Sequence, residues 1–143
     1  MIAQLTNPEE IHYLATQYNW DNGDELIYEI VNHPHCDKGT ALMLYYLAEP
    51  LLYYAKYKDI EDVIKNKENN WEINSFKLIK YIEDKIISDV YRTSLFSFNA
   101  DKELKAYSVF NSNPRNPKFR KDLYDRIPKE CKMNIDGIYQ TPN

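Results

Sequence analysis

HPHCDKGTALMLYYLA, residues 33–48, is the most informative stretch of this sequence, because its second half predicts the helix at the centre of the fold. Every residue from Ala41 to Ala48 is apolar or aromatic. A helix on the surface of a protein has one polar face, whereas a helix that is apolar on all sides is normally buried inside its domain. We therefore predict a buried central helix over these residues.

The residues before this helix predict a turn. Pro34 has no amide hydrogen to donate and disfavours a helical conformation in the residue before it, so a preceding helix should end there. Asp37 suits an N-cap position, because its carboxylate can accept a hydrogen bond from a free amide two or three residues further on. The pair Glu49-Pro50 should end the central helix for the same reason as Pro34.

Further helices are predicted on both sides of this segment. Asn7 and Pro8 form a good helix start, and apolar residues follow them at helical spacing. The same spacing predicts helices over residues 24–32, 51–57, 59–66, 101–110 and 119–124, and a long one over residues 75–91. The expected fold class is mainly α, a compact multi-helix bundle around a buried central helix. Residues 94–99 fit either a short strand or a packed loop.

The length and composition predict one helical domain over residues 1–143. A chain of 143 residues can bury a real hydrophobic core. Its three glycines are too few for the tight turns of a β-sandwich and exclude a glycine-rich phosphate loop. The last residues, 132–143, are expected to form an extended tail.

The sequence contains no sign of export or of a membrane span. The N-terminus lacks the basic and apolar regions of a signal peptide, and no apolar run approaches the roughly 20 residues that a spanning helix needs. Cys36 and Cys131 are the only cysteines and do not suggest a disulfide framework. We therefore predict a cytoplasmic protein that does not contact a membrane.

The charges are distributed unevenly along the chain. Residues 1–70 hold 5 basic and 12 acidic side chains, a net charge of −7, whereas residues 71–143 hold 13 and 10, a net charge of +3. An acidic half attracts basic surfaces over a distance. A pI of 5.4, without a recognisable nucleic-acid-binding motif, predicts a basic protein partner and no direct contact with nucleic acid.

The segment from His33 to Asp37 contains residue types that bind metals or act in catalysis. Zinc needs about four ligands that converge from separated positions, and adjacent residues rarely point at one centre. A catalytic thiolate at Cys36 needs a base and an orienting group, and no third residue can be identified. We predict that Asp37 caps the helix, Cys36 packs in the core and His33 and His35 bond locally, without metal, cofactor or catalytic residue.

The residues proposed to bind a partner are acidic side chains and tyrosines on either side of the central helix. Tyr53, Tyr54 and Tyr57 cannot all face inward on one helix, so at least one of them should lie near the surface. Tyrosine beside acidic residues suits a protein–protein contact. The proposed set is Asp21, Asp24, Glu25, Glu29, Asp59, Glu61 and Asp62, with Tyr53 and Tyr57 as aromatic anchors.

Residues 33–42 resemble the His-Pro-x-Cys-Asp-x-Gly-Thr-Ala-Leu motif of an uncharacterised bacterial domain family. In that family a tryptophan-acid segment precedes the motif, as Trp20-Asp21 does here. The resemblance covers about residues 18–55, the motif-bearing core, and transfers no catalytic residue, because the family has no assigned enzyme activity. It implies an architectural motif made of Trp20, His33, Pro34, Cys36, Asp37, Gly39 and Thr40.

Small acidic helical proteins of this type also resemble the immunity proteins of bacterial toxin–immunity systems, including contact-dependent growth inhibition. Those proteins bind a toxin domain, often a nuclease, and neutralise it. This resemblance implies a non-enzymatic protein-binding module whose partner is a cognate, basic toxin domain. The alternatives are a small thiol- or metal-dependent enzyme that uses residues 33–37, and an adaptor that has no toxin as its partner.

Overall fold

The computed structural model describes residues 2–66, 70–111 and 121–139, and its fold is mainly helical, as predicted. The elements are α1 (Pro8–Gln17), α2 (Glu25–Val31), α3 (Lys38–Leu47), α4 (Pro50–Lys56), α5 (Ile60–Asn66), α6 (Asn70–Ile87), α7 (Ala100–Asn111) and α8 (Lys121–Arg126), with the 3₁₀ turns η1 (Ile2–Gln4), η2 (Trp20–Asn22) and η3 (Lys129–Cys131). Residues 119 and 120, the first two of the helix predicted over 119–124, lie outside the described residues.

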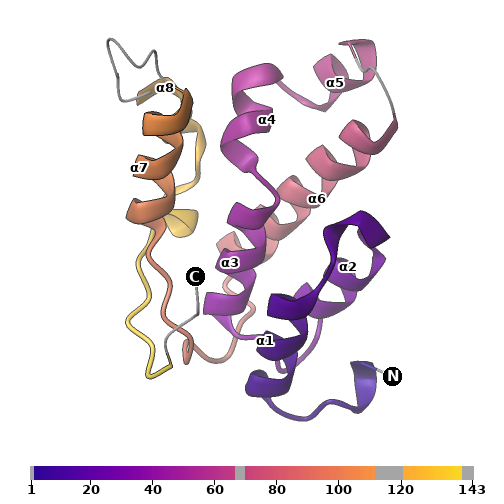
Figure 1. Ribbon diagram of the computed structural model, residues 1–143, viewed down its shortest axis with the longest axis vertical. Coiled ribbons are helices and arrows are strands. Elements are labelled where there is room, and N and C mark those ends of the chain that lie inside the picture. The colour runs from indigo at the N-terminus through magenta and orange to yellow at the C-terminus, as the bar shows by residue number, and fades with distance from the viewer. Residues whose placement is uncertain (1, 67–69, 112–120, 140–143) are drawn as a thin grey trace.

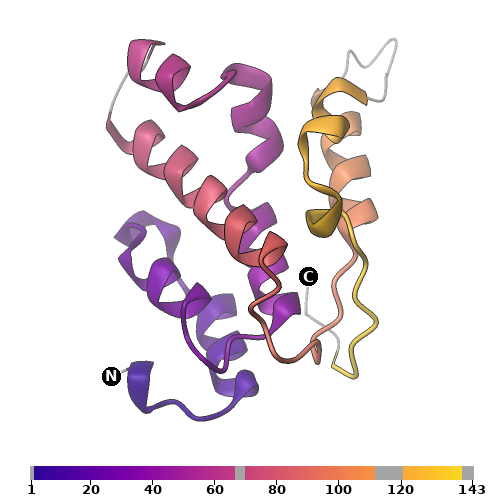
Figure 2. The ribbon, with the colours of Figure 1, turned by 180° about the vertical axis from the view of Figure 1, so that it is seen from behind.

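The helices pack around α3 (Figure 1). Helices α1 and α2 lie on one side of the column formed by α3 and α4, and α7 and α8 lie on the other side, an arrangement that the reverse view also shows (Figure 2). Helix α6 crosses this column and contacts α2, α3, α4, α5 and η3. All residues of α3 from Gly39 to Tyr46 are buried. The prediction of a buried central helix is thus confirmed.

The long helix α6 differs in its limits from the helix predicted over residues 75–91. It begins at Asn70, and Glu72 is buried in its first turn, where the carboxylate accepts hydrogen bonds from Lys56 (2.6 Å) and Tyr57 (2.8 Å). It ends at Ile87, and Asp89 then adopts a left-handed conformation with φ 52° that turns the chain away. The apolar spacing continues to Val90, but this side chain is exposed.

Asp37 connects the start of α3 to a segment far along the chain. Its carboxylate caps α3 as predicted, accepting a hydrogen bond from the Gly39 amide at 2.9 Å. It also accepts hydrogen bonds from the Thr93 hydroxyl (2.6 Å) and from the Leu95 (2.7 Å) and Phe96 (3.1 Å) amides. A fully buried carboxylate with four donors fixes the chain after α6 against the central helix.

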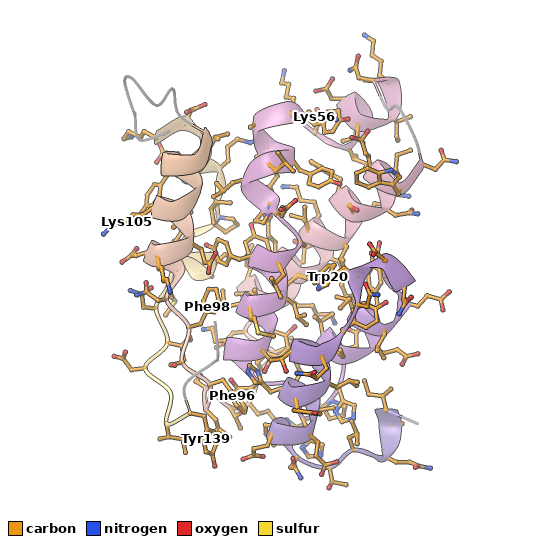
Figure 3. All side chains as sticks on the ribbon, viewed as in Figure 1. Trp20, Lys56, Phe96, Phe98, Lys105 and Tyr139 are labelled. Carbon is orange, nitrogen blue, oxygen red and sulfur yellow. The ribbon has the colours of Figure 1, made fainter. Side chains whose placement is uncertain are left out.

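The segment after α6 pairs with the end of the chain. Isolated bridges join Phe96 to Tyr139 and Phe98 to Ile135, so residues 94–99 are extended and packed, and the described residues contain no regular strand. Figure 3 shows Phe96, Phe98 and Tyr139 on the same side of the molecule. The predicted tail, 132–143, is therefore docked as far as Tyr139, and residues 140–143 lie outside the described residues.

The expectation that a tyrosine of α4 lies near the surface is wrong. Tyr53 and Tyr54 are both buried, because α4 packs against α6 on one side and α8 on the other. Tyr57, which follows α4 in an extended conformation, is buried as well. Tyr54 donates a hydrogen bond to the buried Glu83 of α6. On its other side Arg126 of α8 lies over the Tyr54 ring, with its guanidinium carbon 4.3 Å from the ring centre.

Gly39→Ala is expected to destabilise the fold strongly. A Cβ atom at Gly39 would lie 2.0 Å from the Phe96 carbonyl oxygen, so α3 and the segment bound to Asp37 would have to separate. Overpacking of this kind costs about 3 kcal/mol of unfolding free energy, measurable by chemical denaturation. The matched control is Gly23→Ala, where φ is 94° but the surroundings are open, so about 1 kcal/mol is expected. Equal losses in the two variants would contradict the close approach at Gly39.

Candidate functional site

The residues from His33 to Thr40 form the joint between α2, α3 and the segment after α6. The Nε2 atom of His33 donates to the Ile2 carbonyl oxygen (3.0 Å), and its Nδ1 atom accepts from the His35 amide (3.0 Å). Thr40 lies 2.7 Å from Nδ1 of the buried His12. Burial lowers the pKa of His12, although the nearby Asp37 carboxylate opposes this shift. These side chains are occupied in holding the joint together.

The two thiols do not have the environment of a reactive cysteine. Cys36 and Cys131 are both free and buried. Burial raises the pKa of the Cys36 thiol far above its usual range, and it raises the pKa of Cys131 to about 12. A nucleophilic cysteine needs the opposite, a lowered pKa and access to substrate. Within the described residues, no three His, Cys, Asp or Glu side chains are grouped closely enough to hold a metal ion.

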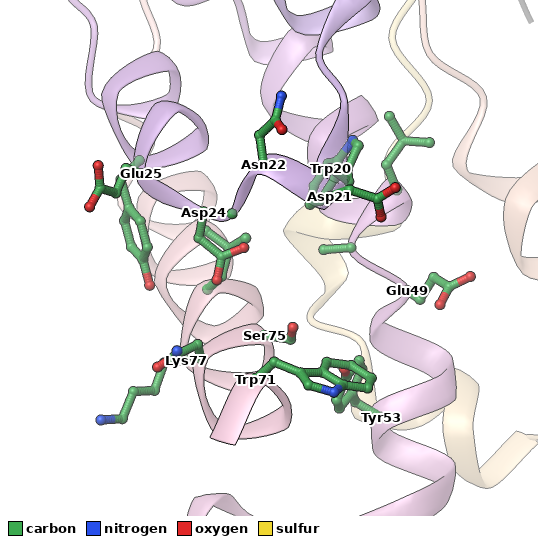
Figure 4. A pocket seen from close by; sticks show the side chains of 16 residues that line it. Trp20, Asp21, Asn22, Asp24, Glu25, Glu49, Tyr53, Trp71, Ser75 and Lys77 are labelled. Atoms are coloured by element: carbon green, nitrogen blue, oxygen red, sulfur yellow. The ribbon is translucent and has the colours of Figure 1, made fainter. Parts of the chain in front are cut away.

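A cleft of about 990 Å³ lies elsewhere, where four parts of the chain meet (Figure 4). These parts are η2, the start of α2, the joint between α3 and α4, and the first half of α6. In Figure 4, Trp20 and Asp21 lie above the opening, Trp71 and Tyr53 below it, and Asp24 and Glu49 on its two sides. We call this site the acidic cleft.

The charges of the acidic cleft are mostly negative. Its carboxylates are those of Asp21, Asp24, Glu25 and Glu49, and its one basic side chain is Lys77. Lys77 points away from the other labelled side chains in Figure 4. In the part of the chain that the structure describes, none of these four carboxylates forms an ion pair. With four carboxylates against one lysine, the cleft carries a net negative charge.

Large apolar side chains are exposed within this ring of charge. Trp71 at the start of α6 has 58% of its surface exposed, and Leu47 at the end of α3 has 51%. Both line the acidic cleft, together with the half-buried Trp20 and Tyr28. Exposed tryptophan enclosed by charged residues is typical of the centre of a binding surface rather than of an ordinary solvated face.

Glu49 has an unfavourable backbone conformation at the edge of the acidic cleft. It adopts φ 63° and ψ 56°, the left-handed region, between the end of α3 and Pro50. Glycine is the usual residue at such a helix end, and another residue costs about 1 kcal/mol there. The Glu49 side chain makes no capping hydrogen bond to α4 that would offset this cost. Strain of this kind is found more often at functional sites than elsewhere.

Asp24 is a partly buried carboxylate at the start of α2. It occupies the N-cap position but makes no side-chain capping hydrogen bond. Burial raises the pKa of Asp24 above its usual value of 3.8. The raised pKa means that the folded chain holds a negative charge there at neutral pH against a desolvation cost.

Comparison with known families identifies the N-terminal part of the chain. Residues 6–87, more than half of the sequence, match the domain of unknown function DUF4274. The chain belongs to this family. Comparison with curated proteins and with solved structures gave no match.

The DUF4274 region contains the whole acidic cleft, because every residue that lines it lies between Trp20 and Leu78. Helices α7 and α8 and the turn η3 follow this region in the sequence. They pack on the other side of α3 and α4 (Figures 1 and 2). None of the described helices is both long and apolar enough to cross a bilayer.

The structure brings together some of the partner-binding residues predicted for this DUF4274 chain and separates others. Asp21, Asp24, Glu25 and Tyr53 line the acidic cleft. Tyr53 is only 6% exposed, so it belongs to the wall of the cleft and is not the predicted surface anchor. Glu29 instead faces a second, mainly apolar hollow beside His33. The remaining four predicted residues are Tyr57, Asp59, Glu61 and Asp62, none of which lines the cleft.

Three of those four residues have local roles in the DUF4274 chain. Tyr57 is only 3% exposed and donates its hydroxyl hydrogen bond to Glu72, so it is not available as a surface anchor. Asp59 and Asp62 form hydrogen bonds at the start of α5: Asp59 accepts from the Asp62 amide (2.8 Å), and Asp62 accepts from the Lys58 amide (2.8 Å). Glu61 is exposed in the first turn of the same helix.

Sequence reasoning missed Trp71, Leu47 and Glu49 as residues of the acidic cleft. Trp71 stands in a polar stretch, and a large aromatic residue in such a stretch could have drawn attention to it. Glu49 occupies a helix end where glycine or asparagine is usual. Leu47 gives no signal in the sequence, because it belongs to the all-apolar run of the buried helix.

Asp24→Asn is expected to stabilise the DUF4274 chain at neutral pH. The folded-state pKa of Asp24 lies above 3.8, so its ionised form opposes folding at about pH 7. This effect disappears as the pH falls from the raised pKa to below the unfolded-state pKa, because the group is then protonated in both states. Urea denaturation should show a higher unfolding free energy for the variant at about pH 7, with a smaller difference at about pH 3.5. An unchanged or lower value at pH 7 would contradict the desolvation of Asp24.

Proposed function

We propose that this DUF4274 chain is a non-enzymatic protein-binding module, an immunity protein that binds and neutralises a basic toxin domain in the cytoplasm. The acidic cleft carries the proposal. Its four carboxylates have no ion-pair partner within the described residues and surround the exposed Trp71 and Leu47. An apolar centre inside a charged rim is the usual composition of a specific protein interface.

The charge of the cleft fits a toxin that acts on nucleic acid. A nuclease binds phosphates, so its active surface is basic. An acidic protein is attracted to that surface, associates with it rapidly and covers the groups that bind the substrate. The net charge of −7 over residues 1–70 extends this attraction beyond the cleft itself.

Two features of the cleft support binding over a purely structural role. Glu49 retains a charged side chain in a backbone conformation that suits glycine, and Asp24 retains a charge that burial disfavours. Both residues reduce the stability of the unbound chain. A basic partner that pairs with these carboxylates would offset both costs on binding.

The direct test begins with the open reading frames beside the one for this chain, one of which should encode a basic toxin domain if the proposal is right. Cells that express this domain should survive only when the chain is expressed with it. The purified proteins should bind with a dissociation constant of about 1 nM, corresponding to about −12 kcal/mol. The association rate should fall steeply as salt rises from about 0.05 M to about 0.5 M, because screening shortens the range of the attraction.

Other outcomes would favour the alternative functions. A chain that protects no cell and co-purifies with a housekeeping protein is an adaptor. Stoichiometric zinc in the purified protein, or rapid alkylation of native Cys36, would favour the enzyme. We expect slow alkylation, because burial raises the pKa of this thiol.

A further inference from the structure

We infer that the acidic cleft receives one arginine side chain of its partner, with the guanidinium lying against the Trp71 indole and paired with Asp24. This inference rests on the proposed function only in taking the partner to be a protein. Its evidence is the combination of an open cleft, the exposed Trp71 ring and carboxylates that form no ion pair within the described residues.

The chain already contains an arginine that lies over an aromatic ring, with backbone carbonyl oxygens as its acceptors. The Arg126 guanidinium lies over the Tyr54 ring at 4.3 Å and donates hydrogen bonds to the carbonyl oxygens of Tyr57 (3.0 Å) and Lys58 (2.7 Å). Lysines also lie over the rings of Tyr57, Tyr81 and Tyr124. An aromatic ring beside oxygen acceptors is therefore a cation site that this chain uses repeatedly.

The acidic cleft has the same two components without the cation. Among the described residues, no lysine or arginine lies over the Trp20 or Trp71 ring. Tryptophan is the aromatic side chain that attracts cations most strongly, and more than half of the Trp71 surface is open to a ligand. Burial also raises the pKa of Asp24, which fits a carboxylate whose countercharge arrives with a ligand.

The arrangement favours arginine over lysine. The carboxylates come from three different parts of the chain: Asp21 from η2, Asp24 from the start of α2 and Glu49 from the joint before α4. In Figure 4 they lie on different sides of the opening. A guanidinium has five N–H donors spread around a flat group, so it can stack on a ring and pair with several acceptors, whereas an ammonium is compact and strongly hydrated.

The sequence provides a specific reporter for the test. The chain has two tryptophans, and both line the acidic cleft, so its intrinsic tryptophan fluorescence reports on this site alone. The probes are three capped tripeptides, acetyl-Gly-X-Gly-amide, in which X is arginine, lysine or citrulline. Citrulline has nearly the shape of arginine and no charge.

We expect the arginine tripeptide to change the fluorescence with a dissociation constant of about 1 mM, the strength usual for a ligand of this size. The lysine tripeptide should bind at least about fivefold more weakly, and citrulline should give no response. Asp24→Asn should weaken arginine binding about tenfold. Asp89→Asn, which removes the same charge from an exposed position outside the cleft, should leave it unchanged.

Equal binding of the lysine and arginine tripeptides would overturn the assignment to arginine, and unchanged binding in Asp24→Asn would overturn its placement at Asp24. The result is separable from the proposed function. If the chain binds the arginine tripeptide but no basic toxin domain, this inference stands and the proposed function is wrong. If the chain neutralises the toxin but gives no response to the tripeptide, the proposed function stands and only this inference is wrong.

Discussion

Asp37→Asn is expected to lower the unfolding free energy by about 4 kcal/mol, more than any other single conservative substitution in the motif. The Asp37 carboxylate accepts four hydrogen bonds, two at each oxygen, from Gly39, Thr93, Leu95 and Phe96. In asparagine one of these oxygens becomes an NH₂ group, which cannot accept a hydrogen bond. Placed towards Gly39 and Phe96, it leaves two buried amides without an acceptor. Placed towards Thr93 and Leu95, it leaves the Leu95 amide without one, and the Thr93 hydroxyl must rotate to accept from it. Each buried amide without an acceptor costs about 1–3 kcal/mol, and the remaining hydrogen bonds are weakened by the loss of the charge.

Thermal unfolding and urea denaturation both measure this effect. A loss of about 4 kcal/mol in a chain of this size corresponds to a melting temperature lower by about 10–15 °C. Asp89→Asn is the control, since Asp89 also follows a turn of the chain but is 78% exposed and lies 3.9 Å from its partner Lys38. We expect a change within about 0.5 kcal/mol there, as exposed ion pairs contribute little. A loss below about 1 kcal/mol in Asp37→Asn would show that the four hydrogen bonds do not hold the joint.

The central part of the fold could be predicted because its signals are local. The all-apolar run from Ala41 to Ala48 predicts burial without knowledge of any partner, and Asp37 needs only its own helix to act as a cap. The second role of Asp37 could not be predicted in this way. Its other donors belong to residues 93–96, more than 50 positions further along, and no local pattern relates the two segments.

The tyrosines of α4 show where the local argument fails. Helical periodicity places Tyr53, Tyr54 and Tyr57 on more than one face, and for a helix with one buried face an exposed tyrosine follows. Helix α4 instead ends at Lys56, so Tyr57 is extended and does not follow the helical periodicity. The helix is also covered from two sides, by α6 and by α8. Which faces of a helix are buried depends on how many neighbours it has, and this number is a property of the whole fold.

The acidic cleft could be predicted only in part for the same reason. Asp21, Asp24 and Glu25 are close in the sequence, so their grouping is visible there. Trp71 and Glu49 reach the cleft from α6 and from the α3–α4 joint, and only the packing of these elements brings them beside the acidic residues. The sequence therefore predicts the charge of the site, while its concave shape and its aromatic wall depend on tertiary structure.

The double substitution Asp21→Lys/Asp24→Lys is expected to weaken binding of the basic toxin domain by about 100-fold to 1,000-fold. Each substitution removes an attraction in the cleft and introduces a repulsion against the partner's cations. Close charge pairs across an interface contribute about 1.5 kcal/mol or more each, so two reversals amount to at least about 3 kcal/mol. The fold should tolerate them, because neither side chain forms a helix-capping hydrogen bond.

A matched variant distinguishes direct contact between the toxin and the cleft from the long-range electrostatic attraction of the whole protein. Asp84→Lys/Asp136→Lys reverses two exposed carboxylates that do not line the cleft, and it changes the net charge by the same amount. Both variants should slow association, because the field of the whole protein steers the encounter. Only Asp21→Lys/Asp24→Lys should also speed dissociation, since the dissociation rate depends on contacts in the formed complex. Equal dissociation rates in the two variants would place the toxin on another surface.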